Sequence, residues 1–203
     1  MPEVWHSGPF AMVYAWHDNG ITSWPVPPRQ GDNRRFRWHD MIRVLFVCMG
    51  NICRSPMAQG VLEQRLHEER LVHRVQVDSA GTHSYHAGDP PDPRGVAAAR
   101  RRGIEISGQR SRPVCEDDFT EFDLILAMDS DNERGLRALC PPDYDDRVMQ
   151  VLEFAPELRE REVPDPYYVG GLGFEKVLDM LDLCIEGLMD ELHDRLNERD
   201  TIA

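Results

Sequence analysis

The sequence predicts an α/β fold, a three-layer sandwich in which a four-stranded parallel sheet is flanked by helices. The first observation is a set of four short segments that read as strands, at residues 43–48, 75–79, 122–128 and 148–152, with continuous apolar runs in the first and the third. The second is that stretches with helical periodicity separate and follow these runs. Strands that alternate with helices are typical of a parallel sheet with helices on its faces.

The first strand and the helix after it have the clearest signals. Residues 43–48 are almost continuously apolar, which is typical of a strand buried on both faces. After a short loop, Ser55 and Pro56 predict the start of a helix, with Ser55 as its cap and Pro56 at the first helical position. The apolar side chains of this helix share one face. They are Ala58, Val61, Leu62 and Leu66.

The later helices follow from similar patterns. Residues 96–102 predict a helix that Gly103 ends, and residues 130–139 predict another. The last helix carries an apolar stripe at helical spacing. Its members are Phe174, Val177, Leu178, Leu181, Ile185, Leu188, Leu192 and Leu196.

Residues 1–40 differ from the rest of the chain and form a separate N-terminal extension. They contain all four tryptophans and a proline-rich stretch at residues 25–28, and they show no strand or helix periodicity. Two interpretations stay open: a poorly ordered extension, or a start codon assigned too early, with Met41 as the true start. The regular pattern begins at Met41, so we expect the folded domain to cover residues 41–203.

Composition limits the classes of function. The chain has 203 residues and a formal net charge of −13. This charge argues against a nucleic-acid partner, because phosphate backbones bind to basic patches. No apolar run reaches the length of a membrane span, and the N-terminus lacks the pattern of a secretory signal. We therefore expect a cytoplasmic protein without a membrane span.

The five cysteines do not have the spacing of a disulfide framework or a metal site. They are Cys48, Cys53, Cys115, Cys140 and Cys184. An odd, scattered set in a chain of this length is not typical of a secreted disulfide-bonded protein, and no Cys/His cluster has zinc spacing. We expect no metal site and no cofactor, and we expect Cys184 to be buried because it lies in the last apolar helix.

The loop after the first strand contains the most informative motif, a cysteine and an arginine separated by five residues. Those five residues are Met49, Gly50, Asn51, Ile52 and Cys53. In a parallel sheet, ligands bind beyond the carboxyl ends of the strands, where this loop lies. Five residues are enough to wrap the backbone around a tetrahedral anion with its N–H groups inward. The helix start adds unpaired donors, and Arg54 adds a planar fork suited to phosphate oxygens.

The same surroundings predict a reactive Cys48. A helix N-terminus and a nearby cation stabilise a thiolate, which is then placed for in-line attack on phosphorus. Ser55 can donate its hydroxyl to this thiolate. Gly50 allows close backbone approach and unusual dihedral angles, and Asn51 suits a left-handed turn. A P-loop nucleotide site is the alternative, but the lysine of its motif is absent.

Attack on the phosphorus of a phosphate ester also requires an acid that protonates the departing oxygen. Residues 163–168, which read VPDPYY, offer Asp165 as that acid. Two prolines flank Asp165 and fix its direction, and a carboxylic acid can protonate a tyrosine oxygen as it leaves. Tyr167 and Tyr168 are suited to wall the pocket and stack on an aromatic substrate. An aspartate between prolines is by itself most often a turn, so the cysteine loop is what favours a catalytic role.

With these motifs together, the sequence resembles a low-molecular-weight protein tyrosine phosphatase of the bacterial type, from about Arg43 to Leu196. The most specific matches are VCMGNICRSPMA at 47–58 and VPDPYY at 163–168. Supporting matches are DSAGT at 78–82, DPRG at 92–95 and FDLILAMD at 122–129. Residues 41–203 are then the phosphatase domain.

The resemblance implies a four-stranded parallel sheet with flanking helices and a two-step reaction through a phosphocysteine. By position, Cys48 is the nucleophile, Arg54 is the phosphate binder, and Asp165 is the acid of the first step and the base of the second. Asn51 and Ser55 shape the loop. The implied partner is a phosphotyrosine-containing protein, and the oligomeric state stays open.

Three further positions are interpreted through the resemblance. Cys53 matches a cysteine that in the family can form a reversible disulfide with the nucleophile. Gln109 stands where the family often has a histidine, and we expect its amide to keep part of the same loop support. Tyr85 falls at a variable specificity position on the pocket rim.

Other functions stay open. Arsenate reductase uses a similar fold but needs two relay cysteines close together, whereas Cys115 and Cys140 are far apart in the sequence. A non-catalytic phosphate-binding module needs neither a thiolate nor an acid. A phosphatase for phosphoarginine or small phosphomonoesters differs only in its substrate, and the paired tyrosines favour a flat aromatic leaving group.

Overall fold

Four strands form one sheet in the computed structural model, which describes residues 41–169 and 171–202. The strands are β1 (Ile42–Cys48), β2 (Val75–Gly81), β3 (Leu124–Ala127) and β4 (Val148–Gln150). All neighbours are parallel and the order is β2-β1-β3-β4, so the predicted four-stranded parallel sheet is confirmed. The N-terminal extension predicted for residues 1–40 lies outside the described residues.

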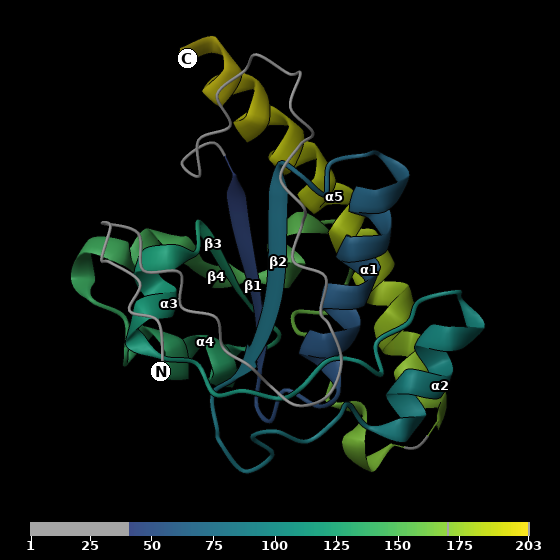
Figure 1. Ribbon diagram of the computed structural model, residues 1–203. Helices are drawn as coiled ribbons and strands as arrows, with labels where there is room; N and C mark the ends of the chain where they lie inside the picture. Colours follow the sequence, from purple (N-terminus) through teal and green to yellow (C-terminus); the bar gives the residue numbers. More distant parts are fainter. Residues whose placement is uncertain (1–40, 170, 203) are drawn as a thin grey trace, which may run out of the picture. The chain divides into compact units, whose positions relative to one another are not determined.

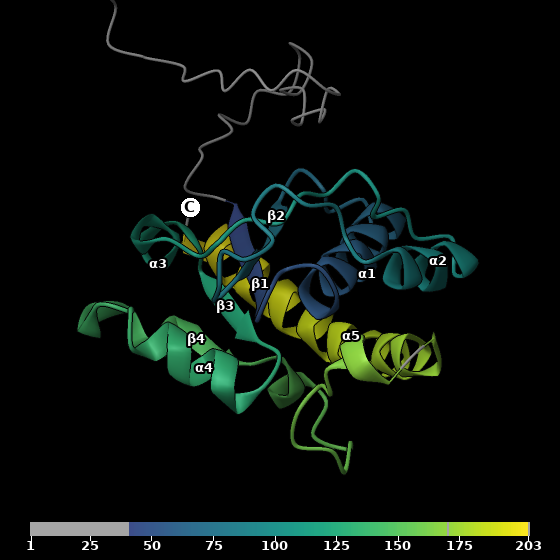
Figure 2. The same ribbon diagram turned by 90° about the horizontal axis from the view of Figure 1, so that it is seen from below.

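Helices lie on both sides of this sheet (Figures 1 and 2). On one side are α1 (Arg54–Glu68), α2 (Pro93–Arg101) and α5 (Gly171–Ile202). On the other side are α3 (Glu116–Glu121) and α4 (Ser130–Arg137). Short 3-10 turns η2 (Pro142–Arg147), η3 (Val151–Phe154) and η4 (Pro166–Tyr168) join the later elements. The three-layer arrangement follows the prediction.

The central strand β1 is buried on both faces. Val44 and Phe46 pack into the core that also contains side chains of α1 and α5. Leu45 and Val47 pack into a second core on the other face, together with Phe119 of α3. Successive side chains of a strand point to opposite faces, so a strand between two helical layers needs apolar residues at every position. This explains the continuous apolar run.

Helix α2 begins at Pro93, earlier than the sequence predicted, because Asp92 caps it. The Asp92 carboxylate accepts a hydrogen bond from the backbone N–H of Arg94 at 2.8 Å, and proline suits the first helical position. At the other end, Gly103 has a φ of 78° and its N–H bonds back to the helix. The predicted end at Gly103 is confirmed, since glycine adopts this left-handed conformation without steric cost.

The third and fourth strands are shorter than their apolar runs. The N–H of Phe122 bonds to the carbonyl of Asp118 and ends α3, so β3 starts later than predicted. Helix α3 itself was not predicted, because its six residues are too few to show a helical period. Val151 and Leu152, predicted as the end of the fourth strand, begin η3 instead.

The cysteines are all free, and Cys184 is buried in α5 as predicted. Within the part of the chain that the structure describes, no helix has the length and apolarity required to cross a membrane.

Helix α5 packs tightly against η3 at Gly187. A Cβ atom at this position would lie 2.0 Å from the carbonyl oxygen of Phe154. The obstacle is backbone, which cannot rotate away as a side chain can. Gly108 is a contrasting case, because a Cβ there would meet nothing within 4 Å.

We expect Gly187→Ala to lower the free energy of unfolding by about 2–4 kcal/mol, because α5 or η3 must shift to admit the methyl group. Gly108→Ala is the matched control and should change it by less than about 0.5 kcal/mol. Urea denaturation measures both values. Equal stability of the two variants would contradict the close packing of α5 on η3.

Candidate active site

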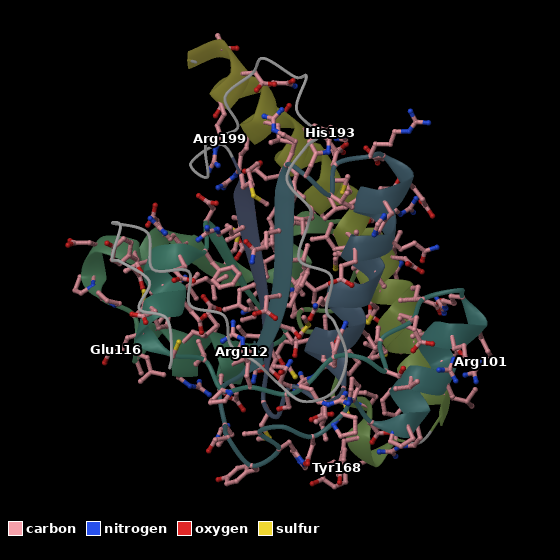
Figure 3. The ribbon with its side chains drawn as sticks, in the orientation of Figure 1. Arg101, Arg112, Glu116, Tyr168, His193 and Arg199 are labelled. Carbon is pink, nitrogen blue, oxygen red and sulfur yellow. The ribbon has the colours of Figure 1, made fainter. Side chains whose placement is uncertain are left out.

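A pocket of about 260 Å³ opens beyond the carboxyl end of β1. It is lined by Cys48, Met49, Gly50, Ile52, Cys53, Arg54, Tyr85, His86, Asp165, Tyr167 and Tyr168. Figure 3 shows Tyr168 at the edge of the molecule toward which β1 runs. The fold thus brings together every residue proposed from the sequence except Asn51, Ser55 and Gln109, which lie behind the lining.

Cys48 is the last residue of β1 and Arg54 is the first residue of α1. Both side chains are 3% exposed. The Sγ atom of Cys48 lies 3.1 Å from the Oγ atom of Ser55. The sheet and the helix, both rigid elements, therefore fix the two ends of the loop that lines the pocket.

Asn51 organises the middle of this loop. Its φ is 54°, a left-handed conformation that asparagine tolerates better than most residues. Its Nδ2 donates to the hydroxyls of Ser55 and Ser79, each at 2.9 Å. Its Oδ1 accepts from the backbone N–H of Arg112 at 2.9 Å. Three bonds from one buried side chain tie the loop to α1, to β2 and to the segment before α3.

The loop turns its carbonyl groups outward. The carbonyls of Cys48 and Met49 accept N–H bonds from Thr82 and His83 after β2. The carbonyls at positions 50 and 52 also accept bonds from outside the loop. Among the described residues, none of the backbone N–H groups at 49–53 has a protein partner. A run of unpartnered N–H groups at a helix start is an anion site.

The glycine that permits this arrangement is Gly81, which the sequence analysis missed. A Cβ on Gly81 would lie 2.8 Å from the Met49 carbonyl oxygen and 3.1 Å from the Asn51 nitrogen. Gly50 was expected to adopt an unusual conformation, but among the described glycines only Gly88 and Gly103 have positive φ. The left-handed turn of this loop is made by Asn51, as the sequence suggested.

Arg54 is held by partners from two other segments. Its Nη1 donates to the carbonyl of Val163 at 3.0 Å and to the carboxylate of Asp129, and its Nη2 lies 3.5 Å from the Asp165 carboxylate. Burial by itself would lower the pKa of Arg54, but the negative charge on Cys48, Asp129 and Asp165 outweighs it and raises that pKa. Arg54 therefore keeps its charge at the base of the pocket.

Asp165 stands on the pocket wall next to Arg54. Its side chain is 40% exposed, and its Oδ1 accepts the backbone N–H of Tyr167 at 3.0 Å. This bond caps η4 and orients the carboxylate, since Pro166 at the start of the turn fixes the backbone. The other carboxylate oxygen faces Arg54.

The pocket mouth is aromatic. Tyr167 and Tyr168 are 41% and 89% exposed, and their rings meet edge to face with centroids 5.0 Å apart. Tyr85, which also lines the pocket, is 79% exposed and stacks on His83. Exposed aromatic side chains at the mouth of a pocket with an arginine in its lining suit a flat aromatic ligand with a negatively charged end.

Ser55 and Gln109 lie outside the pocket lining. The predicted capping role of Ser55 was wrong: Cys53 is the N-cap of α1, without a side-chain bond. The Ser55 hydroxyl instead bonds Asn51, Cys48 and the carbonyl of Ala80 in the buried network. Gln109 donates from its Nε2 to the Pro56 carbonyl at 3.1 Å, so it contacts α1 rather than the loop side chains.

Cys53 differs from Cys48 in its surroundings. Burial, followed by the negative charges of Cys48 and Asp92, raises the pKa of the Cys53 thiol. The pocket thus contains one thiol at the base of the loop and a second that resists ionisation.

Sequence reasoning missed Asp129 and His86. Asp129 lies two residues after the end of β3, binds Arg54 and caps α4 through the N–H of Asn132. The rule that located Cys48 at a strand end would have found it, because β1 and β3 are neighbours. His86 lines the pocket, but it lies in a loop without a sequence signal.

The comparisons with known proteins all give the same family. Residues 43–198 match the family model of low molecular weight phosphotyrosine protein phosphatases. A low molecular weight protein-tyrosine-phosphatase of Bacillus subtilis is 38% identical over 149 residues, which cover 73% of this chain and 94% of that protein. The phosphatase of Gallus gallus is 35% identical over 151 residues, or 74% and 95% of the two chains. A crystal structure of an Entamoeba histolytica protein tyrosine phosphatase is 40% identical with a TM-score of 0.73, covering 75% and 97%.

We expect Asn51→Ala to lower the free energy of unfolding by about 3 kcal/mol, because three buried bonds are lost and alanine disfavours a positive φ. Asn51→Gly should cost about 1 kcal/mol less, since glycine accepts that conformation. Asn197→Ala, on the exposed face of α5, serves as the control in urea denaturation. A stability loss for Asn51→Ala no larger than for Asn197→Ala would contradict the organising role of Asn51.

Proposed function

The chain belongs to the low molecular weight phosphotyrosine protein phosphatase family, and we propose that it hydrolyses phosphotyrosine through a covalent phosphocysteine at Cys48. Its relatives are named as protein-tyrosine phosphatases, which are hydrolases of phosphoric monoesters. The observation that carries the mechanism is the meeting of a thiol, a buried arginine and a carboxylate in one pocket. A site that only bound phosphate would need neither the thiol nor the acid.

In the first step, Cys48 Sγ attacks phosphorus while the bond to the tyrosine oxygen breaks. The N–H groups at 49–53 and Arg54 bind the equatorial oxygens, where negative charge gathers in the transition state. Asp165 gives its proton to the leaving oxygen, so that neutral tyrosine departs. The bond between Arg54 and Asp129 supports this step by fixing the guanidinium.

In the second step, the Asp165 carboxylate takes a proton from water, whose oxygen attacks the phosphorus of the phosphocysteine. The sulfur–phosphorus bond breaks and Cys48 leaves as a thiolate. The Ser55 hydroxyl, 3.1 Å from Sγ, can donate to that thiolate and so stabilise it as a leaving group. Inorganic phosphate is released and the free enzyme is restored.

The proposed substrate is a protein that carries phosphotyrosine. Tyr85, Tyr167 and Tyr168 at the mouth support an aromatic leaving group. Phosphoarginine or a small phosphomonoester would use the same phosphate loop but gain less from these rings. Relative hydrolysis of the two kinds of substrate decides between them.

Arsenate reduction receives no comparable support. It would need further cysteines near the nucleophile, and within residues 41–169 and 171–202 the pocket lining contains only Cys48 and Cys53. Cys115 is exposed before α3, and Cys140 is half-buried after α4.

We expect Cys48→Ser to lose about 10⁴-fold or more in the hydrolysis of a phosphotyrosine peptide, because the hydroxyl is a far weaker nucleophile than a thiolate. The assay contains EDTA, and wild-type activity should persist in it. Cys115→Ser is the matched control, since that cysteine is exposed.

Equal activity of wild type and Cys48→Ser would contradict the cysteine mechanism. Faster turnover of phosphoarginine than of the phosphotyrosine peptide by the wild type would overturn the proposed substrate while leaving the mechanism intact.

We also expect hydrogen peroxide to inactivate the enzyme reversibly. Peroxide oxidises the Cys48 thiolate to sulfenic acid, the Cys53 thiol attacks that sulfur, and water leaves as the disulfide forms. Dithiothreitol should then restore wild-type activity but not that of Cys53→Ala, whose sulfenic acid oxidises further. Cys115→Ala is the control, and equal recovery of Cys53→Ala and wild type would refute this protective role.

A further inference from the structure

The segment that carries Asp165 is held at two points, one on each side of the carboxylate. Arg54 donates to the carbonyl of Val163 at 3.0 Å. Arg94 donates from its Nη1 to the carbonyl of Tyr167 at 3.0 Å. In the sequence, Asp165 lies midway between the two residues whose carbonyls are bound. Arg54 and the loop at residues 49–53 form the phosphate loop, which binds phosphate in the proposed mechanism. That mechanism assigns no role to Arg94.

Arg94 is itself fixed by Asp92. The Asp92 carboxylate accepts from the Arg94 backbone N–H at 2.8 Å, from Nε at 2.9 Å and from Nη2 at 2.7 Å. Asp92 is nearly buried, with 9% exposed, and its own N–H donates to the Ile52 carbonyl at 2.7 Å. A continuous chain of bonds therefore links the phosphate loop through Asp92 and Arg94 to Tyr167.

Two aromatic rings orient the Arg94 guanidinium further. It lies 5.3 Å from the ring centroid of Tyr167 and 5.0 Å from that of Phe174. Phe174 is fully buried in the first turns of α5. The Nε and Nη2 atoms of the planar guanidinium bind Asp92, and Nη1 binds the Tyr167 carbonyl. The face of the guanidinium lies near the two rings. Lysine, with a single ammonium group, cannot make these contacts together.

We propose that Arg94 is a positioning residue for Asp165, setting where the acid stands above the phosphate loop. This rests on the proposed function of Asp165. Arg94 does not line the pocket. It acts through the Tyr167 backbone, whose N–H binds Asp165 Oδ1. Proton transfer to a leaving oxygen depends steeply on distance and direction, so a loosened segment weakens acid catalysis more than phosphate binding.

The test compares aryl phosphates whose leaving phenols differ in basicity, with kcat/KM as the readout of the first step. In Arg94→Ala and Arg94→Lys we expect kcat/KM to fall about tenfold for phenyl phosphate and only about twofold for p-nitrophenyl phosphate, which leaves readily without a proton. Inhibition by inorganic phosphate should stay unchanged.

Arg101→Ala is the matched control. Arg101 also lies on α2 and also binds α5, through Glu175, but it does not line the pocket and lies apart from Tyr168 (Figure 3). We expect Arg101→Ala to keep the wild-type values of kcat/KM for both phenyl phosphate and p-nitrophenyl phosphate. An equal loss for both substrates in Arg94→Ala, or no loss for either, would overturn the positioning role.

A double-mutant cycle separates this proposal from the proposed function. With Asp165→Asn already present, Arg94→Ala should reduce kcat/KM for phenyl phosphate by less than about twofold, because no acid remains to be positioned. A further tenfold loss in that background would overturn the proposal. If Asp165→Asn alone leaves the dependence on the leaving group unchanged, the acid role itself fails, whatever Arg94 does.

Discussion

The buried hydrogen bonds of Asn51 hold the loop at residues 49–53 in the conformation on which the rest of the candidate site depends. The loop must turn its carbonyls outward so that its N–H groups are left for an anion. A left-handed residue in the middle makes that turn, and the side chain of the same residue secures it to α1, β2 and Arg112. Without this turn and its hydrogen bonds, the Cys48 thiol and the Arg54 guanidinium would no longer be held so that both can contact one bound anion.

The second requirement is a fixed position of Asp165, the proposed acid, relative to this loop. The segment with Asp165 comes from a distant part of the sequence and lacks regular structure apart from η4. Arginines provide the connection, since a guanidinium can bind a carboxylate and a backbone carbonyl at once. Arg54 does so with Asp129 and Val163, and Arg94 does so with Asp92 and Tyr167. Electrostatics also favour the arrangement, because the carboxylates and Cys48 keep Arg54 charged despite its burial.

Much of the fold and the site could be predicted from the sequence, because the strongest signals are local. The apolar run of β1 indicated a strand buried on both faces, and the cysteine and arginine at the two ends of the next loop indicated an anion site. Capping was harder to predict: Ser55 looked like a helix cap, but its hydroxyl is needed in the buried network. Gly81 and Arg94 could not be found in the sequence, because their roles depend on contacts between segments that only the folded chain brings together.

The most direct test of the central claim is to trap the covalent intermediate. The wild type and Asp165→Asn are mixed with a ³²P-labelled phosphotyrosine peptide, quenched with alkali within milliseconds and mapped by proteolysis and mass spectrometry. The cysteine mechanism predicts phosphate on Cys48 of the wild type, and slower labelling of Cys48 in Asp165→Asn because the first step lacks its acid. An active enzyme that carries no label, or carries it on another residue, would contradict the mechanism.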